Sequence, residues 1–361
     1  MEAIKNFDFK GELKSVGPFG CGHINDTYLL TFALEDQSEC KIILQKMNKN
    51  VFPKPVELME NVMGVTTYLK KLIDAQGGDS ERETLNVIPA KDGKAYYQDS
   101  EGEFWRAYKF ITDATCYEQV EKPEDFYESG VAFGRFQYML ADYPAETLHE
   151  TIEDFHNTKK RFATFKKAVE EDVMGRAASV QKEIQFVLDR EDVANYFTDL
   201  QEKGELPLRV THNDTKLNNV MIDNKTGKGI CVIDLDTVMP GLAMNDFGDT
   251  IRFGASTAAE DEKDLSKVSC DMDLYDIYAK GFMEGYGGKL TQREIELMPM
   301  GAKVMTYECG MRFLTDYLQG DVYFKIQREE HNLDRARTQF KLVADMEDKW
   351  EIMTEIIKKY M

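Results

Sequence analysis

The periodicity of apolar residues changes after Thr112, and no other feature limits the possible folds of the chain as strongly. Before this point, short apolar runs such as Thr27–Phe32 and Lys41–Met47 are separated by a polar turn, which is typical of antiparallel strands. A helical repeat begins at Pro55, and strand character returns over Glu103–Ile111. We therefore expect an N-terminal lobe of an antiparallel sheet and one helix.

The remainder of the chain has a helical repeat for most of its length. We expect the N-terminal lobe to span residues 1–111 and a larger, mostly helical lobe to span residues 112–361, which together make an α+β, bilobal fold. One polar stretch, Val210–Asp249, breaks the helical repeat. Five segments are predicted to be helical: Pro123–Ala141, Thr158–Leu188, Leu265–Tyr286, Gln292–Tyr317 and Arg335–Lys359.

The chain is strongly acidic, with 65 Asp and Glu against 45 Lys and Arg in 361 residues, a formal net charge of −20. Because it has no block rich in Lys or Arg, we expect neither a nucleic-acid partner nor a membrane partner. No apolar run approaches the length of a bilayer span, and Met1 is followed by mixed polar sequence. These observations predict a cytoplasmic protein. We expect it to be a monomer or weak oligomer, although composition and charge do not decide its oligomeric state.

The cysteines and histidines do not suggest a metal centre. The six cysteines are scattered without a Cys-x-x-Cys pair, and none of the five histidines stands at ligand spacing from another. We expect the cysteines to be free thiols that pack as small hydrophobic residues, and we do not expect a zinc site.

The polar stretch contains the residues best suited to chemistry. Two short apolar runs flank the turn Asn224–Gly227 and predict a hairpin. Asp214 and Asn219 precede the hairpin and Asp234 ends it, so its folding would bring two carboxylates and an amide oxygen together. Hard oxygen ligands of this kind bind Mg²⁺ together with nucleotide phosphates.

A glycine cluster, Gly17–Gly22, lies between two strands of the N-terminal lobe. Glycines such as Gly20 and Gly22 allow backbone N–H groups to approach phosphate oxygens, although the same cluster also suits an ordinary tight hairpin. Glu60, in the helix after Pro55, either pairs with a strand lysine or is solvated.

The order of these features resembles that of protein-kinase-like phosphotransferases. His212–Asn219 is similar to the kinase catalytic loop HRDxxxxN, and Asp234 is similar to the metal-binding Asp of DFG. The glycine of DFG is missing here, because Asp234 is followed by Leu235 and Asp236. The later Asn245–Asp249 resembles the aminoglycoside phosphotransferase superfamily of small-molecule kinases.

Several longer sequence segments are more specific, and they resemble the N-acetylhexosamine 1-kinase family. They cover nearly the whole chain: Ile43–Asn48, Trp105–Arg106, Phe155–Thr158, Tyr307–Lys325 and Glu330–Ala336. This resemblance implies transfer of the γ-phosphate of ATP to the anomeric hydroxyl of GlcNAc or GalNAc, with ATP and Mg²⁺ as cofactors.

The resemblance also implies roles for individual residues. Asp214 is expected to be the catalytic base, because the anomeric hydroxyl is acidic enough for a carboxylate to take its proton. Asn219 and Asp234 are expected to hold Mg²⁺. Arg312 is the candidate for binding sugar oxygens, and Tyr323 and Phe253 are candidates for the walls of the sugar pocket.

Several of these assignments have alternatives in the sequence itself. Arg312 could instead pair with Asp316, four residues on, and Phe253 could be a core residue. His212 is expected to orient the loop. Ile24, beside the glycine cluster, could face either substrate.

The lysine that kinases present to the nucleotide phosphates has no certain counterpart. One alignment of Ile43–Leu44–Gln45 places Gln45 there, and a shift by one residue places Lys46 there, on the opposite face of the strand. The connection over residues 110–113 is expected to lie against the adenine.

Two other functions also fit the sequence. A kinase for a cationic acceptor, such as an aminoglycoside or choline, would suit the acidic composition and predicts an acidic cluster in the C-terminal lobe. A binding module without catalysis is disfavoured by the intact Asp214, Asn219 and Asp234. The sequence does not rank GlcNAc against GalNAc.

Overall fold

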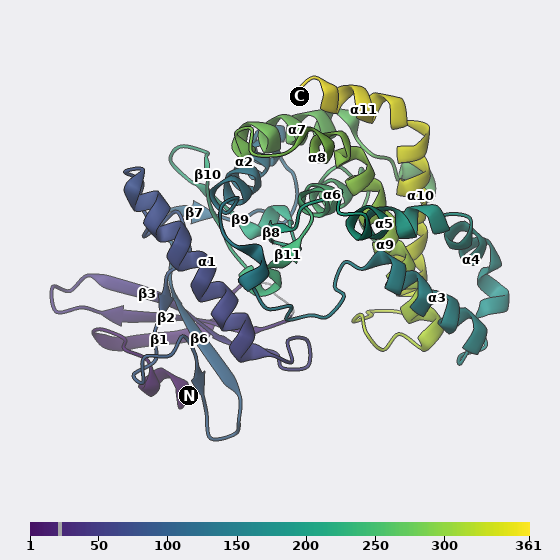
Figure 1. The fold of residues 1–361 in the computed structure, drawn as a ribbon. Coiled ribbons are helices and arrows are strands. Elements are labelled where there is room, and N and C mark those ends of the chain that lie inside the picture. The colour runs from purple at the N-terminus through teal and green to yellow at the C-terminus, as the bar shows by residue number, and fades with distance from the viewer. Residues whose placement is uncertain (21–23) are drawn as a thin grey trace. The chain divides into compact units, whose positions relative to one another are not determined.

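The computed structural model describes residues 1–20 and 24–361, which divide into two compact units (Figure 1). The two units interleave along the chain. Unit 1 comprises Met1–Cys116, Met139–Glu153 and Val220–Pro240, and unit 2 comprises Tyr117–Tyr138, Asp154–Asn219 and Gly241–Met361.

Unit 1 is built on an antiparallel sheet whose strands run in the order β1-β2-β3-β6-β4, with β5 also paired to β6 (Figure 1). The predicted antiparallel sheet is confirmed, and its strands β1, β2 and β3 are neighbours in the sheet as they are in the chain. The strands are β1 (Glu12–Pro18), β2 (Asp26–Ala33), β3 (Glu39–Lys46), β4 (Val87–Ile88), β5 (Tyr97–Gln98) and β6 (Phe104–Lys109).

One face of this sheet is covered by the N-terminal segment. Leu30 and Phe32 of β2 alternate with outward residues, so both point to the same face and are buried there with Phe7. Phe7 follows a short 3-10 helix over Ala3–Asn6. The hydrophobic cluster of this face is Ala3, Phe7, Leu30, Phe32, Ile42, Leu44, Ala90, Trp105 and Ala107.

The helix α1 (Pro55–Ala75) is the predicted helix of the N-terminal part. Proline at the first position suits a helix start, because its missing N–H would have no partner there. The apolar positions recur at three and four residues and bury one side of the helix: Leu58, Met59, Val62, Val65, Leu69 and Ile73.

The predicted hairpin after the polar stretch is present. Strands β9 (Val220–Asp223) and β10 (Gly229–Val232) pair antiparallel, and β7 (Ala114–Thr115) pairs with β9 on its other side. A 3-10 helix over Leu235–Thr237 follows β10, and the strands β8 (Arg209–Thr211) and β11 (Met239–Gly241) lie on either side of this region in the chain.

Unit 2 is mostly helical (Figure 1). Its helices are α2 (Pro123–Met139, of which the last residue belongs to unit 1), α3 (Thr158–Glu171), α4 (Gln181–Leu188), α5 (Glu191–Glu202), α6 (Ala243–Gly254), α7 (Met272–Tyr286), α8 (Gln292–Glu296), α9 (Met298–Gln319), α10 (His331–Asp348) and α11 (Trp350–Lys358). In the described residues no helix is both long and apolar enough to cross a membrane.

Several predicted helices are wrong in their extent. The segment Thr158–Leu188 is not one helix, because Asp172 and Gly175 adopt positive φ and end the first part before α4 begins. Gln292–Tyr317 is interrupted at Leu297, after which α9 begins at Met298 with Pro299 in its first turn. Leu265–Tyr286 contains a short 3-10 helix over Leu265–Lys267 before α7, and the predicted Arg335–Lys359 is divided into α10 and α11. The helices α5 and α6 were not predicted at all, and α6 begins within the polar stretch Val210–Asp249.

Glycines allow α6 and α9 to cross closely in unit 2. A Cβ on Gly248 would lie 2.2 Å from the carbonyl oxygen of Gly301, and a Cβ on Gly301 would lie 2.2 Å from the carbonyl oxygen of Met244. Any larger side chain at either position would therefore force the two backbones apart. This crossing fixes the start of α6, which carries Asp246, against the long helix α9.

Candidate functional site

The loop after β8 is held by a buried carboxylate from α6. Asp246 accepts hydrogen bonds from the backbone N–H groups of His212 and Asn213, both at 2.8 Å, and from the side-chain amide of Gln137 at 2.5 Å. Burial raises the pKa of Asp246, against the opposing effect of His212 and of these hydrogen bonds. The network holds Asn213 at a φ of 64°, and so fixes the direction in which Asp214 leaves the loop.

His212 is buried beside aromatic rings of α2. Its ring lies edge-on to Phe133, with 5.4 Å between the ring centroids, and to Phe136 at 6.1 Å. Its ring nitrogen Nδ1 also accepts the backbone N–H of Asp214 at 3.3 Å. These contacts support the predicted role of His212 in orienting the loop.

Asp214 and Asn219 lie together in unit 2. The side-chain amide nitrogen of Asn219 donates to the backbone carbonyl of Asp214 at 2.8 Å and lies 3.4 Å from its carboxylate. The pairing leaves the amide oxygen of Asn219, a hard ligand, for another partner. The spacing predicted from the sequence thus brings these two side chains together.

Lys216 belongs to this group and was not predicted. Its ammonium nitrogen lies 2.7 Å from a carboxylate oxygen of Asp214. Burial alone would lower the pKa of Lys216, but the Asp214 carboxylate outweighs this and raises it, so the lysine stays charged. The sequence contains a signal for this contact, because Lys216 stands two residues after Asp214 in the same loop and the two side chains can meet there.

The other predicted metal ligand, Asp234, belongs to unit 1. It directly follows the strand pair β9–β10, has a φ of 58° and is exposed. The structure therefore presents a carboxylate at the predicted end of the hairpin.

Two residues further on, Asp236 forms a buried ion pair with Arg106 of β6. The side chains are 5% and 2% exposed, respectively. Asp236 also accepts a hydrogen bond from the side-chain amide of Asn25 at 2.7 Å. The loop that carries Asp234 is in this way tied to the sheet of unit 1.

Gln45 and Lys46 of β3 have different surroundings. Gln45 accepts a hydrogen bond from Arg106 Nε at 3.0 Å and donates one to Thr27 at 3.0 Å, so it lies on the same face as the Arg106–Asp236 pair. Lys46 points to the opposite face, where its ammonium nitrogen lies 3.7 Å from Glu103.

The remaining residues predicted to bind nucleotide lie in unit 1 as well. Gly20 has a φ of 76°, and no atom lies within 4 Å of the place a Cβ would take. Gly22 lies outside the described residues. Glu60 does not pair with a strand lysine, because its carboxylate lies 2.6 Å from Nε2 of His149. Ile24 is 47% exposed, and its carbonyl accepts a hydrogen bond from Asn48.

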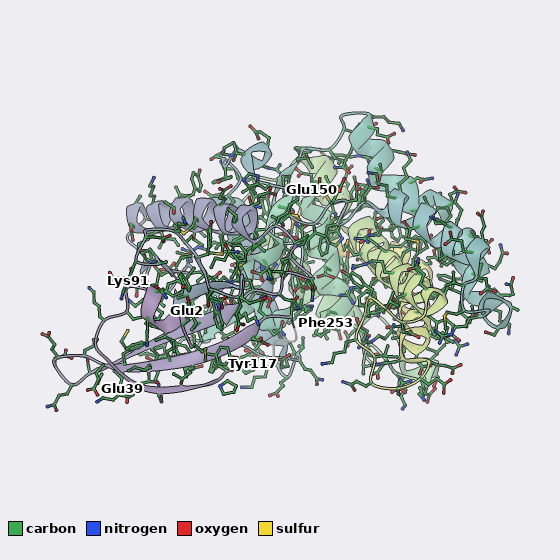
Figure 2. All side chains as sticks on the ribbon, turned by 90° about the horizontal axis from the view of Figure 1, so that it is seen from below. Glu2, Glu39, Lys91, Tyr117, Glu150 and Phe253 are labelled. Atoms are coloured by element: carbon green, nitrogen blue, oxygen red, sulfur yellow. The ribbon has the colours of Figure 1, made fainter. Side chains whose placement is uncertain are left out.

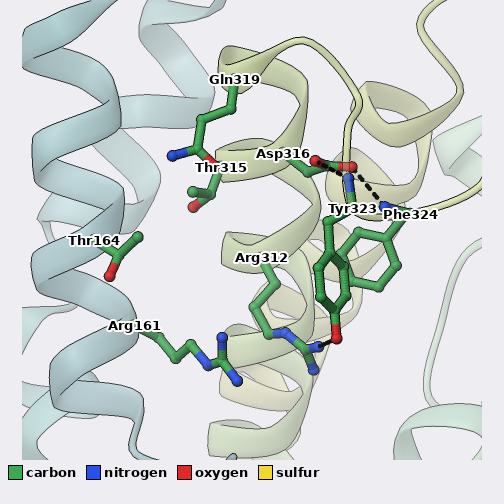
Figure 3. Close-up of a pocket in the computed structure, with 8 residues that line it drawn as sticks. All are labelled: Arg161, Thr164, Arg312, Thr315, Asp316, Gln319, Tyr323 and Phe324. Atoms are coloured by element: carbon green, nitrogen blue, oxygen red, sulfur yellow. Dashed lines mark hydrogen bonds between the residues drawn. The ribbon is translucent and has the colours of Figure 1, made fainter. Parts of the chain in front are cut away.

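The predicted sugar-binding residues Arg312 and Tyr323 line a pocket in unit 2 (Figure 3). The guanidinium of Arg312 lies 3.5 Å from the hydroxyl of Tyr323. It makes no ion pair with Asp316, whose oxygens instead accept the backbone N–H groups of residues 322, 323 and 324. Arg312 is therefore available to a ligand. The lining residues are Arg161, Thr164, Arg312, Thr315, Asp316, Gln319, Tyr323 and Phe324.

Phe253, the other predicted wall of the sugar site, lies near the end of α6 (Figure 2). Its side chain is 37% exposed, so it is not a core residue.

The pocket and the loop of Asp214 are connected within unit 2 by Phe155 and His156. One ring nitrogen of His156 lies 2.9 Å from Glu308, and the other lies 3.4 Å from the carbonyl oxygen of Asn213. The ring of Phe155 lies under the guanidinium of Arg312, 5.8 Å from its central carbon. A molecule in the pocket is thus near the same histidine that contacts the loop.

Comparison with known proteins identifies the family of the chain. The phosphotransferase enzyme family, APH, matches residues 82–280, which is more than half of the chain. The chain belongs to this family. It is therefore a small-molecule phosphotransferase, as its catalytic-loop residues predicted.

Solved structures agree with this assignment at the level of the fold. An aminoglycoside phosphotransferase from Alicyclobacillus acidocaldarius superposes with a TM-score of 0.60 at 9% identity, covering 99% of this chain and 95% of that one. The amicoumacin kinase hAmiN, solved with AMP-PNP, Ca²⁺ and Ami, gives 0.58 at 13% identity over 94% and 90%. A choline kinase from Cryptosporidium parvum gives 0.56 at 15% identity over 95% and 91%. The predicted α+β, bilobal protein-kinase-like fold is confirmed.

Proposed function

We propose that this phosphotransferase transfers the γ-phosphoryl group of ATP to the anomeric C1 hydroxyl of an N-acetylhexosamine, GlcNAc or GalNAc. One observation carries this proposal: Arg312, which has no ion-pair partner among residues 1–20 and 24–361, lies among aromatic rings in a pocket of the unit that also holds Asp214. Arginine donors suit the hydroxyl and carbonyl oxygens of a sugar, and aromatic faces suit its apolar side. The resemblance of Tyr307–Lys325 to the N-acetylhexosamine 1-kinase family supports the same acceptor.

In the proposed reaction Asp214 is the general base. It accepts the proton of the C1 hydroxyl as the oxygen of that hydroxyl attacks phosphorus in line with the departing ADP oxygen. Lys216 lies close enough to Asp214 to keep its carboxylate in place and to meet negative charge that develops at the phosphoryl oxygens. Asp246 and His212 hold the backbone of this loop and do not take part in proton transfer.

Asn219 and Asp234 are proposed to hold Mg²⁺. The donor set fits the ion, because a carboxylate and an amide oxygen are hard ligands and the amide nitrogen of Asn219 is already used by Asp214. When bound, Mg²⁺ neutralises charge on the nucleotide phosphates.

We assign nucleotide binding to the lobe of residues 1–111 and catalysis and sugar binding to residues 112–361. The backbone around Gly20 and Gly22 is proposed to contact the phosphates. The contacts of Gln45 with Arg106 favour Gln45 over Lys46 for the place that lysine takes in other kinases, because Lys46 points to the opposite face.

A cationic acceptor is the alternative, and it predicts free acidic groups in the pocket. Among the described residues a single carboxylate lines the pocket. It belongs to Asp316, and backbone N–H groups and the side chain of Asn332, at 2.9 Å, already donate to it. Two arginines line the same space and would repel a cation. These contacts disfavour a cationic acceptor.

The test is a panel of acceptors with ATP and Mg²⁺, analysed by ³¹P NMR for an anomeric phosphate. GlcNAc, GalNAc, kanamycin and choline are compared under the same conditions, with the Asp214→Asn variant as the inactive control. We expect a sugar 1-phosphate from at least one hexosamine. Phosphorylation of kanamycin or choline without turnover of either hexosamine would contradict the proposal.

A further inference from the structure

Two arginines from different helices point into one pocket of unit 2. Arg161 comes from α3 and Arg312 from α9, and their guanidinium groups face each other across the pocket (Figure 3). Burial and the nearby charge of Arg312 lower the pKa of Arg161. Two like charges held this close are unfavourable unless a negative group lies between them.

The part of the chain that the structure describes places no carboxylate in ion-pair contact with either arginine. Among residues 1–20 and 24–361, neither arginine has a carboxylate oxygen within 4.0 Å. Arg161 donates to the backbone carbonyl of Phe155 at 3.2 Å, but its Nε is buried without a hydrogen-bond partner. A buried charged donor without a partner costs free energy, which indicates that a ligand completes this group.

The acidic residues nearest the pocket are already occupied. Asp316 accepts three backbone N–H groups, and Glu308 accepts Thr158 Oγ1 at 2.5 Å and contacts His156 at 2.9 Å. The charge of Glu308 still acts on both arginines, but only at a longer range than that of an ion pair. Carboxylates are abundant in this chain, whose net charge is −20, yet among the described residues none forms an ion pair with Arg161 or Arg312.

We propose that Arg161 and Arg312 form an oxyanion-binding subsite that takes a phosphate, sulfate or carboxylate group. Guanidinium groups bind such groups through paired N–H donors, and Tyr323 and Phe324 line one side of the pocket next to Arg312. The volume of about 110 Å³ is well above the roughly 10–15 Å³ that a single water needs. That the subsite lies at the acceptor end of the active site rests on the proposed function.

Inorganic sulfate is the probe, and its binding is measured as a shift of the thermal unfolding midpoint. Chloride replaces sulfate in the reference samples so that the ionic strength stays constant. We expect sulfate to raise the midpoint of the wild type, and we expect the apparent affinity to fall at least tenfold in Arg161→Gln. Arg161→Lys keeps the positive charge but loses the paired N–H donors of the guanidinium, and should bind sulfate with intermediate affinity. The matched control is Arg293→Gln, because Arg293 is an exposed arginine of the same unit whose nearest carboxylate lies 3.9 Å away.

Circular dichroism and the midpoint without sulfate show whether each variant is folded. If Arg161→Gln is unfolded, Arg161→Lys decides the result. A sulfate effect equal to that of chloride, or one that the arginine variants leave unchanged, would overturn the proposal.

A second set of measurements separates the two sources of the oxyanion. A kcat/KM for GlcNAc 6-sulfate at least tenfold above that for GlcNAc, lost in Arg161→Gln, supports an anionic substituent on the acceptor. Equal kcat/KM values, together with sulfate binding that depends on Arg161, support a free oxyanion. Because the sulfate measurement needs no turnover, it decides the subsite even if no hexosamine is phosphorylated and the proposed function fails.

Discussion

Arg106 and Asp236, 130 residues apart in the sequence, form an ion pair that is almost completely withdrawn from solvent. Asp236 lies two residues after Asp234, the proposed magnesium ligand. The guanidinium of Arg106 also donates to Gln45 at 3.0 Å and lies over the ring of Tyr108, 5.3 Å from its centroid. One buried arginine thus joins two strands of the sheet to the loop that carries Asp234.

Replacement of Arg106 by methionine should destabilise unit 1, because it leaves the carboxylate of Asp236 buried without its partner. Loss of one member of a buried pair costs about 3–5 kcal/mol. Denaturant unfolding of Arg106→Met, Asp236→Asn and the double variant measures this cost and the coupling between the two residues. Lys70→Met is the control, because the Lys70–Glu81 pair is exposed and should contribute little.

If the loss of unfolding free energy in the double variant equals the sum of the losses in the two single variants, the coupling between Arg106 and Asp236 is contradicted. In that case the contacts of Arg106 with Gln45 and Tyr108, and not the pair with Asp236, would explain its effect on stability.

The Asp214→Asn variant should lose catalysis and keep its fold. Asparagine preserves the size of the side chain but cannot take the proton of the acceptor, and general-base catalysis contributes roughly 10²–10⁴-fold. Steady-state kinetics with the acceptor identified by NMR gives kcat, and the unfolding midpoint shows that the fold is intact. A kcat within a factor of a few of the wild type would remove Asp214 from the role of base.

Lys216 should affect kcat more than KM for the acceptor. Its ammonium group lies 2.7 Å from the carboxylate of Asp214, so Lys216→Met removes positive charge at the place where phosphoryl transfer is proposed. We expect kcat to fall about 10²-fold, as for the loss of a single charge-stabilising donor elsewhere. Lys225→Met, in the exposed turn of the hairpin, is the control and should leave kcat unchanged. A change confined to KM would indicate a role in acceptor binding alone.

The parts of the site that are local in sequence were predictable. Asp214 and Asn219 stand in one short loop, so their spacing alone placed them together, and the apolar runs around Asn224–Gly227 were sufficient to predict the hairpin. Arg106 was not identified as a buried cation, because an arginine in a strand is usually exposed and its partner Asp236 is distant in the sequence.

Other features depend on tertiary contacts that a repeat of apolar residues does not encode. Alternation showed that Gln45 and Lys46 lie on opposite faces of β3, but only the position of Arg106 shows which face each occupies. The break in the predicted helix Thr158–Leu188 depends on the left-handed backbone of Asp172, a residue that helices also accept. Arg161 has no motif and was found only because α3 places it opposite Arg312.

The close crossing of α6 and α9 should make Gly248 intolerant of any side chain. Because the added Cβ of Gly248→Ala would lie 2.2 Å from a backbone oxygen of Gly301, the helices must separate, and overpacking of this kind costs about 1–3 kcal/mol. The same change at Gly17, where nothing lies within 4 Å and φ is not positive, should have little effect on stability. Equal unfolding midpoints for the two variants would show that α6 and α9 can move apart at little cost in stability.

Glu308 should make the stability of unit 2 depend on pH in the acid range. Burial would raise its pKa, but His156, Arg312 and the hydroxyl of Thr158 outweigh burial, so the pKa of Glu308 is lowered below its usual value of 4.5. Its contribution is therefore complete above that value and is lost as the pH falls through the lower pKa of the folded state. Glu308→Gln should cost about 1–3 kcal/mol at pH 7, because it weakens charged hydrogen bonds. The difference in unfolding free energy between variant and wild type should shrink as the pH falls below 4.5. A difference that stays constant between pH 7 and pH 3 would show that the Glu308 carboxylate is not what stabilises this part of the fold.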